Sequence, residues 1–154
     1  NGSGSRWLPG NLFLDTRHVS DMDLARIYHR AHCLLFPSRA EGFGLTALEA
    51  AATGLPIVAT SYSGHLDFLD SETAYLCKYT LGQLENTRGL KQTMALPDPK
   101  DFRDKVVSVI ENYRRAALKG KRASQRAHAE FTWEMAGKQL AGVLREIAKD
   151  VPSD

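Results

Sequence analysis

The feature of this sequence that most constrains its fold is an alternation of short apolar runs with segments of helical periodicity. From residue 11 onward, NLFLD, CLLFP and PIVAT are continuous apolar runs, and MDLARIYHRA and GLTALEAAATG lie between them with helical spacing. Strands without apolar and polar alternation are typical of a parallel sheet that helices cover on both faces. The pattern therefore predicts an α/β fold with a parallel sheet and flanking helices.

Capping residues and chain breakers predict where the first helices begin and end. Asp21, preceded by Ser20, is the expected cap of the first helix. Gly54, followed by Pro56, is expected to end the second helix, because a glycine relieves the backbone there and a proline cannot continue a helix.

The second half of the chain has a different pattern. AYLCKY at 74–79 is expected to be a fourth strand, and residues 80–96 a loop, because their periodicity is weak. After them the chain is predicted to be helical, with a break at Gly120. A last helix is expected to open with Thr132 as its N-cap and Trp133 as its first residue.

Composition indicates one globular domain. The 154 residues are 43% hydrophobic and 25% charged, and a net charge of +2 is too small to indicate nucleic acid or a membrane as the main partner. Residues 1–10, NGSGSRWLPG, are interpreted as a linker or a remnant of cloning, so the domain is expected to be 11–154. Cys33 and Cys77 lie in apolar runs and are expected to be reduced thiols in a cytoplasmic protein.

The segment PSRAEGFGLTALEAAATG, at 37–54, is the most informative part of the chain. It joins a predicted buried strand to a helix through a turn that contains Gly42 and Gly44. A backbone without Cβ atoms can approach a ligand closely, and the first amides of a helix have no partner within the helix. With the positive end of the helix dipole, these amides form a site suited to phosphate.

Two carboxylates, Glu41 and Glu49, bracket these amides. A carboxylate accepts paired hydrogen bonds from neighbouring hydroxyls, so Glu49 suits a ribose and Glu41 suits a hexose at the two ends of a nucleotide sugar. Spacing alone favours a different interpretation, in which Glu49 is an ordinary exposed helix residue and Glu41 is an acid near a helix N-terminus.

A resemblance changes this balance. EGFGLTALE, at 41–49, resembles the E-x7-E motif of the family-four retaining glycosyltransferases, and its context PSRAEGFGLTALEAAATGLPIVAT is similar to that family almost residue by residue. The similarity extends to LARIYHRAHCLLFPS upstream, to TSYSGHLDFLD and AYLCKY downstream, and to FTWEMAGKQL near the end. It covers roughly residues 11–143.

The resemblance implies that 11–154 is part of the C-terminal, donor-binding half of a GT-B fold, a Rossmann-like domain whose first strands are missing from this chain. It implies a hexosyltransferase that transfers a sugar with retention from a UDP- or GDP-sugar to the hydroxyl of a carbohydrate or lipid-linked acceptor. No metal or other cofactor is expected.

The resemblance also assigns roles to residues. Glu41 is the expected catalytic residue, and Glu49 is expected to hold the ribose hydroxyls. His65 is a candidate for contact with the donor, and the turn at Thr16–His18 is a candidate for contact with the base. The diphosphate is expected to bind the motif turn and its backbone amides, at Gly42, Phe43, Gly44, Leu45 and Thr46.

The chain also departs from the family. The first two strands, the loop with the family's Arg and Lys pair and the N-terminal acceptor domain are missing, so these residues alone are expected to bind donor weakly and to transfer no sugar. The family's strand order, 3-2-1-4-5-6, separates NLFLD from CLLFP. Either NLFLD pairs directly with CLLFP, or a second copy or another chain completes the sheet, or NLFLD detaches; we favour completion by another chain, because exposed apolar strand edges invite pairing.

The sequence also leaves functions other than sugar transfer open. A non-catalytic nucleotide- or partner-binding domain could retain the same fold. The segment at 114–126, RRAALKGKRASQR, has six basic residues; a solvated helix face is favoured over contact with anionic lipid at the inner membrane face. It contains no aromatic residue, which argues against nucleic acid. His29 and His32 share a predicted helix, but no further ligand completes a metal site.

Overall fold

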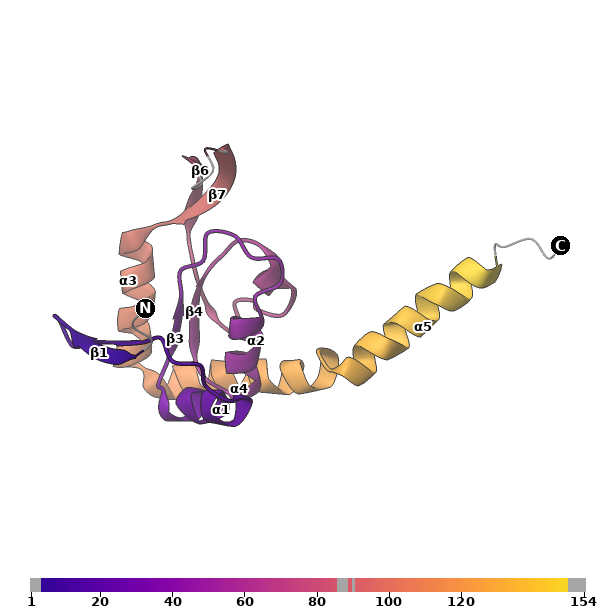
Figure 1. The fold of residues 1–154 in the computed structure, drawn as a ribbon, viewed down its shortest axis with the longest axis horizontal. Helices are drawn as coiled ribbons and strands as arrows, with labels where there is room; N and C mark the ends of the chain where they lie inside the picture. The colour runs from indigo at the N-terminus through magenta and orange to yellow at the C-terminus, as the bar shows by residue number, and fades with distance from the viewer. Residues whose placement is uncertain (1–3, 86–88, 90, 150–154) are drawn as a thin grey trace.

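The centre of the molecule is a parallel sheet in the order β3 (Leu34–Phe36), β4 (Ile57–Thr60) and β5 (Tyr75–Cys77) (Figure 1). The computed structural model describes residues 4–85, 89 and 91–149. All four residues of β4 are buried. Helices cover the sheet, which confirms the predicted α/β fold, and the central strand carries its core.

Alternate residues of β4 face two apolar clusters. Ile57 and Ala59 belong to the larger cluster, which also includes residues of α1 (Asp21–Arg30) and α2 (Leu45–Ala52). Val58 points to the smaller cluster, where α3 (Pro99–Glu111) contributes Val109. Because successive strand residues point to opposite faces, a continuous apolar run is needed when both faces are covered.

Helix α4 (Tyr113–Glu130) runs through Gly120 without interruption, so the predicted break at Gly120 is wrong. The break lies at Asn112, whose Oδ1 accepts a hydrogen bond of 3.1 Å from the Arg115 amide. Gly120 instead lies in close contact with the backbone of Gly54, so that a Cβ at Gly120 would overlap the Gly54 carbonyl oxygen. The missing side chain lets α4 approach the end of α2, where Ser124 Oγ donates to the Ala52 carbonyl oxygen at 2.9 Å.

Part of the basic segment at 114–126 binds the protein itself. Arg122 pairs with Glu72, with 2.5 Å between Nη1 and Oε2, and Arg126 pairs with Asp70, with 3.0 Å between Nη1 and Oδ2. Arg126 Nη2 also donates to the Asp67 carbonyl oxygen at 3.0 Å. These contacts hold α4 against the loop that follows the short 3-10 helix η1 (Gly64–Asp67).

The first strands depart from the prediction. β1 (Ser5–Leu8) and β2 (Leu12–Asp15) form an antiparallel hairpin, so the prediction of a linker over 1–10 is wrong for β1. The turn places Gly10 and Asn11 at φ values of 79° and 61°, which glycine and asparagine tolerate better than other residues. NLFLD is therefore detached from the parallel sheet and not paired with CLLFP. Completion of the sheet by another chain stays a prediction.

A second hairpin replaces the predicted loop over 80–96. β6 (Tyr79–Glu85) pairs in an antiparallel way with β7 (Lys91–Pro97), and the hairpin projects from the body (Figure 1). Most of its residues are exposed, so its strands lack the apolar alternation that would reveal them in the sequence. The Ala95 amide donates to the Arg39 carbonyl oxygen at 2.9 Å, which ties β7 to the loop after β3.

The helix caps are close to those predicted. Ser20 is the N-cap of α1, not Asp21, because Ser20 Oγ accepts the Asp23 amide at 3.2 Å. Gly54, at a φ of 78°, follows the end of α2 as predicted. Thr132 caps α5 (Trp133–Lys149) as predicted: its Oγ1 accepts the Met135 amide at 3.2 Å.

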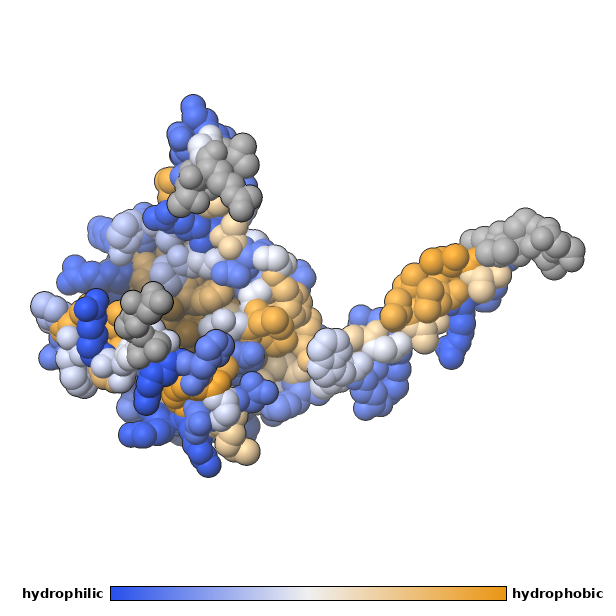
Figure 2. All heavy atoms as spheres, in the orientation of Figure 1, coloured by the Kyte–Doolittle hydropathy of each residue, from blue (hydrophilic) through white to orange (hydrophobic). Residues whose placement is uncertain are grey.

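Helix α5 extends away from the body (Figure 1), and none of its residues is buried. Its apolar side chains form a visible stripe (Figure 2), made of Leu140, Val143, Leu144 and Ile147. Within the described residues, no helix is both long enough and apolar enough to cross a bilayer.

Replacing Gly120 with alanine should destabilise the fold, although alanine is the better helix former. We expect Gly120→Ala to cost about 1 to 3 kcal/mol, because the added Cβ collides with the backbone at Gly54. Gly137→Ala is the matched control, since a Cβ at Gly137 meets nothing within 4 Å and should stabilise α5 by up to about 1 kcal/mol. Urea unfolding followed by circular dichroism measures both; equal stability of the two variants would contradict the role of the contact.

Candidate functional site

The motif turn leaves β3 at the carboxyl edge of the parallel sheet and ends at the N-terminus of α2. Ligands of open α/β folds bind at this edge. Gly44 is the N-cap of α2 and has a left-handed φ of 88°. A Cβ at Gly44 would also lie 3.0 Å from the His65 Cβ. Both the backbone angle and the lack of space therefore favour glycine at this position.

The N-terminus of α2 has the features of an anion site. No side chain caps it, and no acidic residue lies in its first turn, within a helix that is described in full. In the described part of the chain, no hydrogen bond from the amides at 43–46 to another protein group is found. Leu45 and Thr46 are exposed, as is the neighbouring Gly42, whereas Phe43 is half-buried and Gly44 is buried. These amides are free to donate to a ligand, and the helix dipole favours a negative one.

Glu49 lies one turn into α2 with its side chain exposed. The buried Tyr28 of α1 donates its hydroxyl to Glu49 Oε2 at 3.1 Å, and the same hydroxyl lies 3.4 Å from the Thr46 carbonyl oxygen. Burial, and then the hydrogen bond to Glu49, raise the pKa of Tyr28 to about 12. The phenol therefore stays protonated at neutral pH and donates a hydrogen bond to one oxygen of the Glu49 carboxylate.

Glu41 is half-buried in the motif turn and is fixed at both ends. Ser38 Oγ donates to Glu41 Oε1 at 2.7 Å. At the backbone, the Glu41 amide donates to Ser63 Oγ at 2.9 Å. The loop after β4 lies so close that a Cβ at Gly64 would overlap the Gly42 carbonyl oxygen. The structure thus fixes both the backbone and the carboxylate of Glu41 by hydrogen bonds.

His65 lies beneath this site and not on its surface. Its side chain is fully buried, with Nε2 2.6 Å from the Thr60 carbonyl oxygen and the ring edge-on to Phe36. Its Nδ1 has no hydrogen-bond partner among the described residues. The expected contact between His65 and a donor therefore requires a ligand that reaches below the loop, and in this structure the imidazole supports the turn at Gly44.

The side chain of Phe43 packs in the apolar core, and its backbone amide belongs to the motif turn. Its ring packs against Phe68 and Phe131, at centroid distances of 5.4 and 6.2 Å, while its amide is one of those at 43–46 for which no protein acceptor is found among the described residues. An apolar groove of about 660 Å³ continues from here along the start of α5. It is lined by Phe43, Leu45, Leu48, Glu130, Phe131, Thr132, Trp133, Met135, Ala136 and Gln139.

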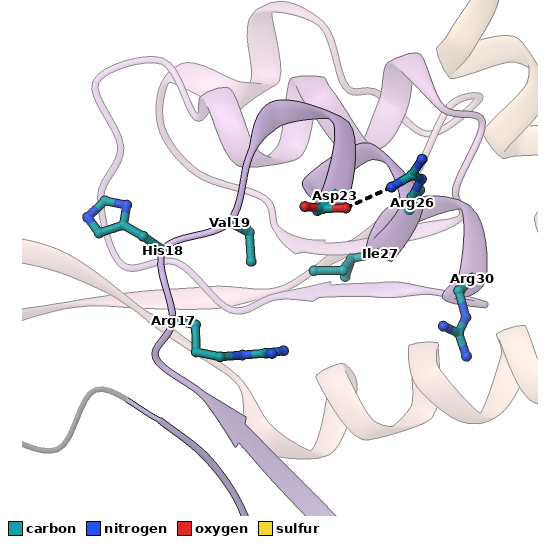
Figure 3. A pocket seen from close by; sticks show the side chains of 7 residues that line it. All are labelled: Arg17, His18, Val19, Asp23, Arg26, Ile27 and Arg30. Carbon is teal, nitrogen blue, oxygen red and sulfur yellow. Dashed lines mark hydrogen bonds and ion pairs between the residues drawn. The ribbon is translucent and has the colours of Figure 1, made fainter.

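The turn at Thr16–His18 belongs to a separate pocket of about 440 Å³ (Figure 3). It is lined by Arg17, His18, Val19, Asp23, Arg26, Ile27 and Arg30. The Arg17 guanidinium grips both oxygens of Asp15, at 2.9 and 2.8 Å, and this contact lowers the pKa of Asp15 to about 2. Arg26 makes a single contact with Asp23, with 2.9 Å between Nη1 and Oδ1. Carboxylates of the chain thus already bind two of the three arginines.

His29 and His32 are expected on one helix, but α1 ends at Arg30, so only His29 is helical. His32 lies beyond it, with its ring 6.0 Å from that of Tyr113. Among the residues that the structure describes, no group of three or more His, Cys, Asp or Glu side chains is arranged to hold a metal ion.

Most of the predicted site residues are brought together by the structure. The motif turn, from Glu41 to Thr46, and Glu49 share one edge of the sheet, whereas Arg17 and His18 line the pocket of Figure 3. Sequence analysis missed the residues that hold the two glutamates: Tyr28, Ser38 and Ser63. The available signal was Tyr28, a hydroxyl-bearing residue on the apolar face of a helix, since buried hydroxyls need a partner.

A family model described as Family 4 Glycosyltransferase in conflict systems matches residues 18–140, which include the whole motif turn and both glutamates. The chain belongs to this glycosyltransferase family. Among curated proteins, the D-inositol 3-phosphate glycosyltransferase of Corynebacterium urealyticum is 32% identical over 125 residues, which are 81% of this chain and 26% of that protein. This glycosyltransferase chain thus spans about a quarter of the length of that relative.

Solved structures have the same fold as this glycosyltransferase chain. Sucrose-phosphate synthase from Thermosynechococcus elongatus matches 90% of it with a TM-score of 0.69 and 24% identity. Anabaena HepE, in complex with UDP-glucose, matches 86% of it with a TM-score of 0.61 and 18% identity. In both cases the match covers 31% of the solved chain.

The contact between Tyr28 and Glu49 predicts how Tyr28 titrates. Its pKa of about 12 lies above the ordinary 10.0, first because of burial and then because of the hydrogen bond to Glu49, so the stability that neutral Tyr28 contributes is present below pH 10 and is lost between pH 10 and 12. Glu49→Ala should lower the pKa of Tyr28 but leave it above 10.0, because burial is the larger cause. NMR of ¹³C-labelled tyrosine rings measures this, with Glu146→Ala, an exposed glutamate of α5, as the control. A pKa of Tyr28 that stays unchanged in Glu49→Ala would contradict the contact.

Proposed function

We propose that this chain is the donor-binding half of a retaining GT-B glycosyltransferase and that it binds a UDP- or GDP-sugar at the turn between β3 and α2. One observation carries the proposal: Glu41 and Glu49 flank an uncapped helix N-terminus with free amides. A nucleotide sugar has its groups in the matching order, with ribose hydroxyls, a charged diphosphate and sugar hydroxyls.

In this proposal the diphosphate binds the amides at 43–46. Each amide supplies a hydrogen-bond donor, and the α2 dipole adds a positive partial charge. The same groups stabilise the negative charge that develops on the leaving nucleotide when the sugar bond breaks. The proposal assigns no metal ion or other cofactor to this step.

The two glutamates bind the two ends of the donor, the ribose and the sugar. Tyr28 binds Glu49 Oε2, which leaves Oε1 and the remaining lone pair of Oε2 for two ribose hydroxyls. Glu41 contacts the sugar hydroxyls, and its negative charge stabilises the positive charge that develops on the sugar ring in the transition state. The acceptor, whose hydroxyl receives the sugar, is a carbohydrate or a lipid-linked molecule, and in this proposal a further domain of the enzyme binds it.

The choice of the first donor to test follows from the relatives. HepE, which shares the fold, was solved with UDP and with UDP-glucose. Calorimetric titration of this chain with UDP-glucose, GDP-mannose and ADP-glucose tests the proposal, with an expected dissociation constant of about 1 mM, or about −4 kcal/mol. Absence of heat from all three donors at about ten times that concentration would contradict it.

Loss of the Glu49 carboxylate should weaken the binding of the nucleotide itself. We expect Glu49→Ala to cost about 1 to 3 kcal/mol in binding UDP or GDP, because the ribose hydroxyls lose their acceptor. Glu146→Ala, on an exposed face of α5, should leave the affinity unchanged. Equal affinity of the Glu49 variant and the parent for both nucleotides would show that the ribose assignment is wrong.

Loss of the Glu41 carboxylate should affect only ligands that carry a sugar. Glu41→Ala is expected to bind UDP as tightly as the parent does and to lose the additional affinity that UDP-glucose gains from its hexose, by about 1 to 3 kcal/mol at most. Titration with both ligands measures this difference. The same loss for UDP and UDP-glucose would contradict the assignment of Glu41 to the sugar.

A further inference from the structure

Ser63 has a backbone conformation that its residue type disfavours. Its φ of 85° and ψ of −169° lie in a region that is essentially restricted to glycine. Asn11 also has a positive φ, but asparagine is common in such turns. A serine in the glycine region is held there at a cost of about 1 to 3 kcal/mol, so other contacts must compensate for it.

Both contacts of the Ser63 hydroxyl reach Glu41, 22 residues away, whereas the Ser63 carbonyl oxygen accepts the Leu66 amide at 3.0 Å. The Glu41 amide donates to Ser63 Oγ at 2.9 Å, and the Ser63 hydroxyl donates back to the Glu41 carbonyl oxygen at 2.5 Å. The Gly64 amide donates to the same carbonyl oxygen at 3.3 Å. A hydroxyl both donates and accepts, so one serine side chain satisfies both backbone groups of Glu41.

Glycine at position 63 would remove the strain but also both hydroxyl contacts. The hydroxyl is therefore the property that explains a serine here. The contact acts on the backbone of Glu41, while Ser38 Oγ holds the carboxylate at 2.7 Å. With its peptide groups fixed on one side and its carboxylate on the other, Glu41 has little freedom to turn.

We propose that Ser63 is a positioning residue, which holds the Glu41 backbone so that the carboxylate meets the sugar of a bound nucleotide sugar. The inference rests on the proposed function of Glu41. It adds that the loop after β4 determines how strongly the site distinguishes a nucleotide sugar from the bare nucleotide. Ser63 itself makes no contact with the nucleotide in this proposal.

Two variants separate positioning from a purely structural role. Ser63→Gly removes the hydroxyl but relieves the backbone strain, so the two effects offset each other and this variant should be more stable than Ser63→Ala. Ser63→Ala removes the same hydroxyl but keeps the strain, so it should unfold at a lower temperature. A structural role predicts that function follows stability, whereas positioning predicts that both variants lose the same function.

The test is the ratio of the dissociation constants of UDP and UDP-glucose, measured by calorimetry for the parent and the variants. We expect Ser63→Gly and Ser63→Ala to lower this ratio about three- to tenfold and to leave UDP affinity within about twofold, the effect of one or two neutral hydrogen bonds. In a Glu41→Ala background, Ser63→Gly should have no further effect on the ratio. Hydrogen exchange at the Glu41 amide should be faster in both serine variants.

The outcomes distinguish the role of Ser63 from the proposed function of Glu41. A parent ratio that Ser63→Gly leaves unchanged, while Glu41→Ala lowers it, overturns the positioning role alone. A ratio that Glu41→Ala also leaves unchanged overturns the proposed function of Glu41, and the role of Ser63 with it. A loss in Ser63→Ala without a loss in the more stable Ser63→Gly shows that Ser63 acts only through stability, which also overturns the proposal.

Discussion

The contact between two loop backbones is the constraint on which the rest of the site depends. The turn after β3 and the loop after β4 approach so closely that neither Gly44 nor Gly64 has room for a side chain. This approach buries His65 under the N-terminus of α2 and places the Ser63 hydroxyl on the peptide groups of Glu41. Because β3 and β4 are adjacent in a parallel sheet, their carboxyl ends bring these loops together without further elements.

Packing of α2 completes the arrangement. Its buried alanines lie against the sheet and Gly54 lies against Gly120 of α4, so the direction of the helix is fixed at both ends. The hydroxyl of Tyr28, on α1, donates a hydrogen bond to the Glu49 carboxylate. The amides, the helix dipole and two carboxylates are therefore organised before a ligand binds, which reduces the cost of binding. Each polar group of the proposed site is held by a residue of the α/β core or of the loops at its edge.

Sequence patterns predicted the parts of the fold whose periodicity reflects burial. The strands around β4 and the end of α2 at Gly54 were readable because both faces of the sheet are covered and because glycine ends helices in a recognisable way. NLFLD was predicted as a strand and forms β2, whereas its partner β1 and the hairpin of β6 and β7 were missed because most of their residues are exposed. Gly120 was taken for a helix break because the sequence does not reveal which helix will approach it. In the proposed site, the motif points to Glu41 and Glu49, whereas Ser63 and Tyr28 contact these glutamates across 22 and 21 residues, which no local pattern reveals.

The central claim is that a nucleotide sugar binds between Glu41 and Glu49 with its diphosphate on the amides of the turn. Backbone amide NMR of the ¹⁵N-labelled chain during titration with UDP-glucose tests it most directly. The account predicts that the largest shifts fall on the amides at 43–46, with smaller shifts near Glu41 and Glu49. Shifts concentrated at the arginine pocket of Figure 3, or along the groove beside Trp133, with the amides at 43–46 unchanged, would contradict it.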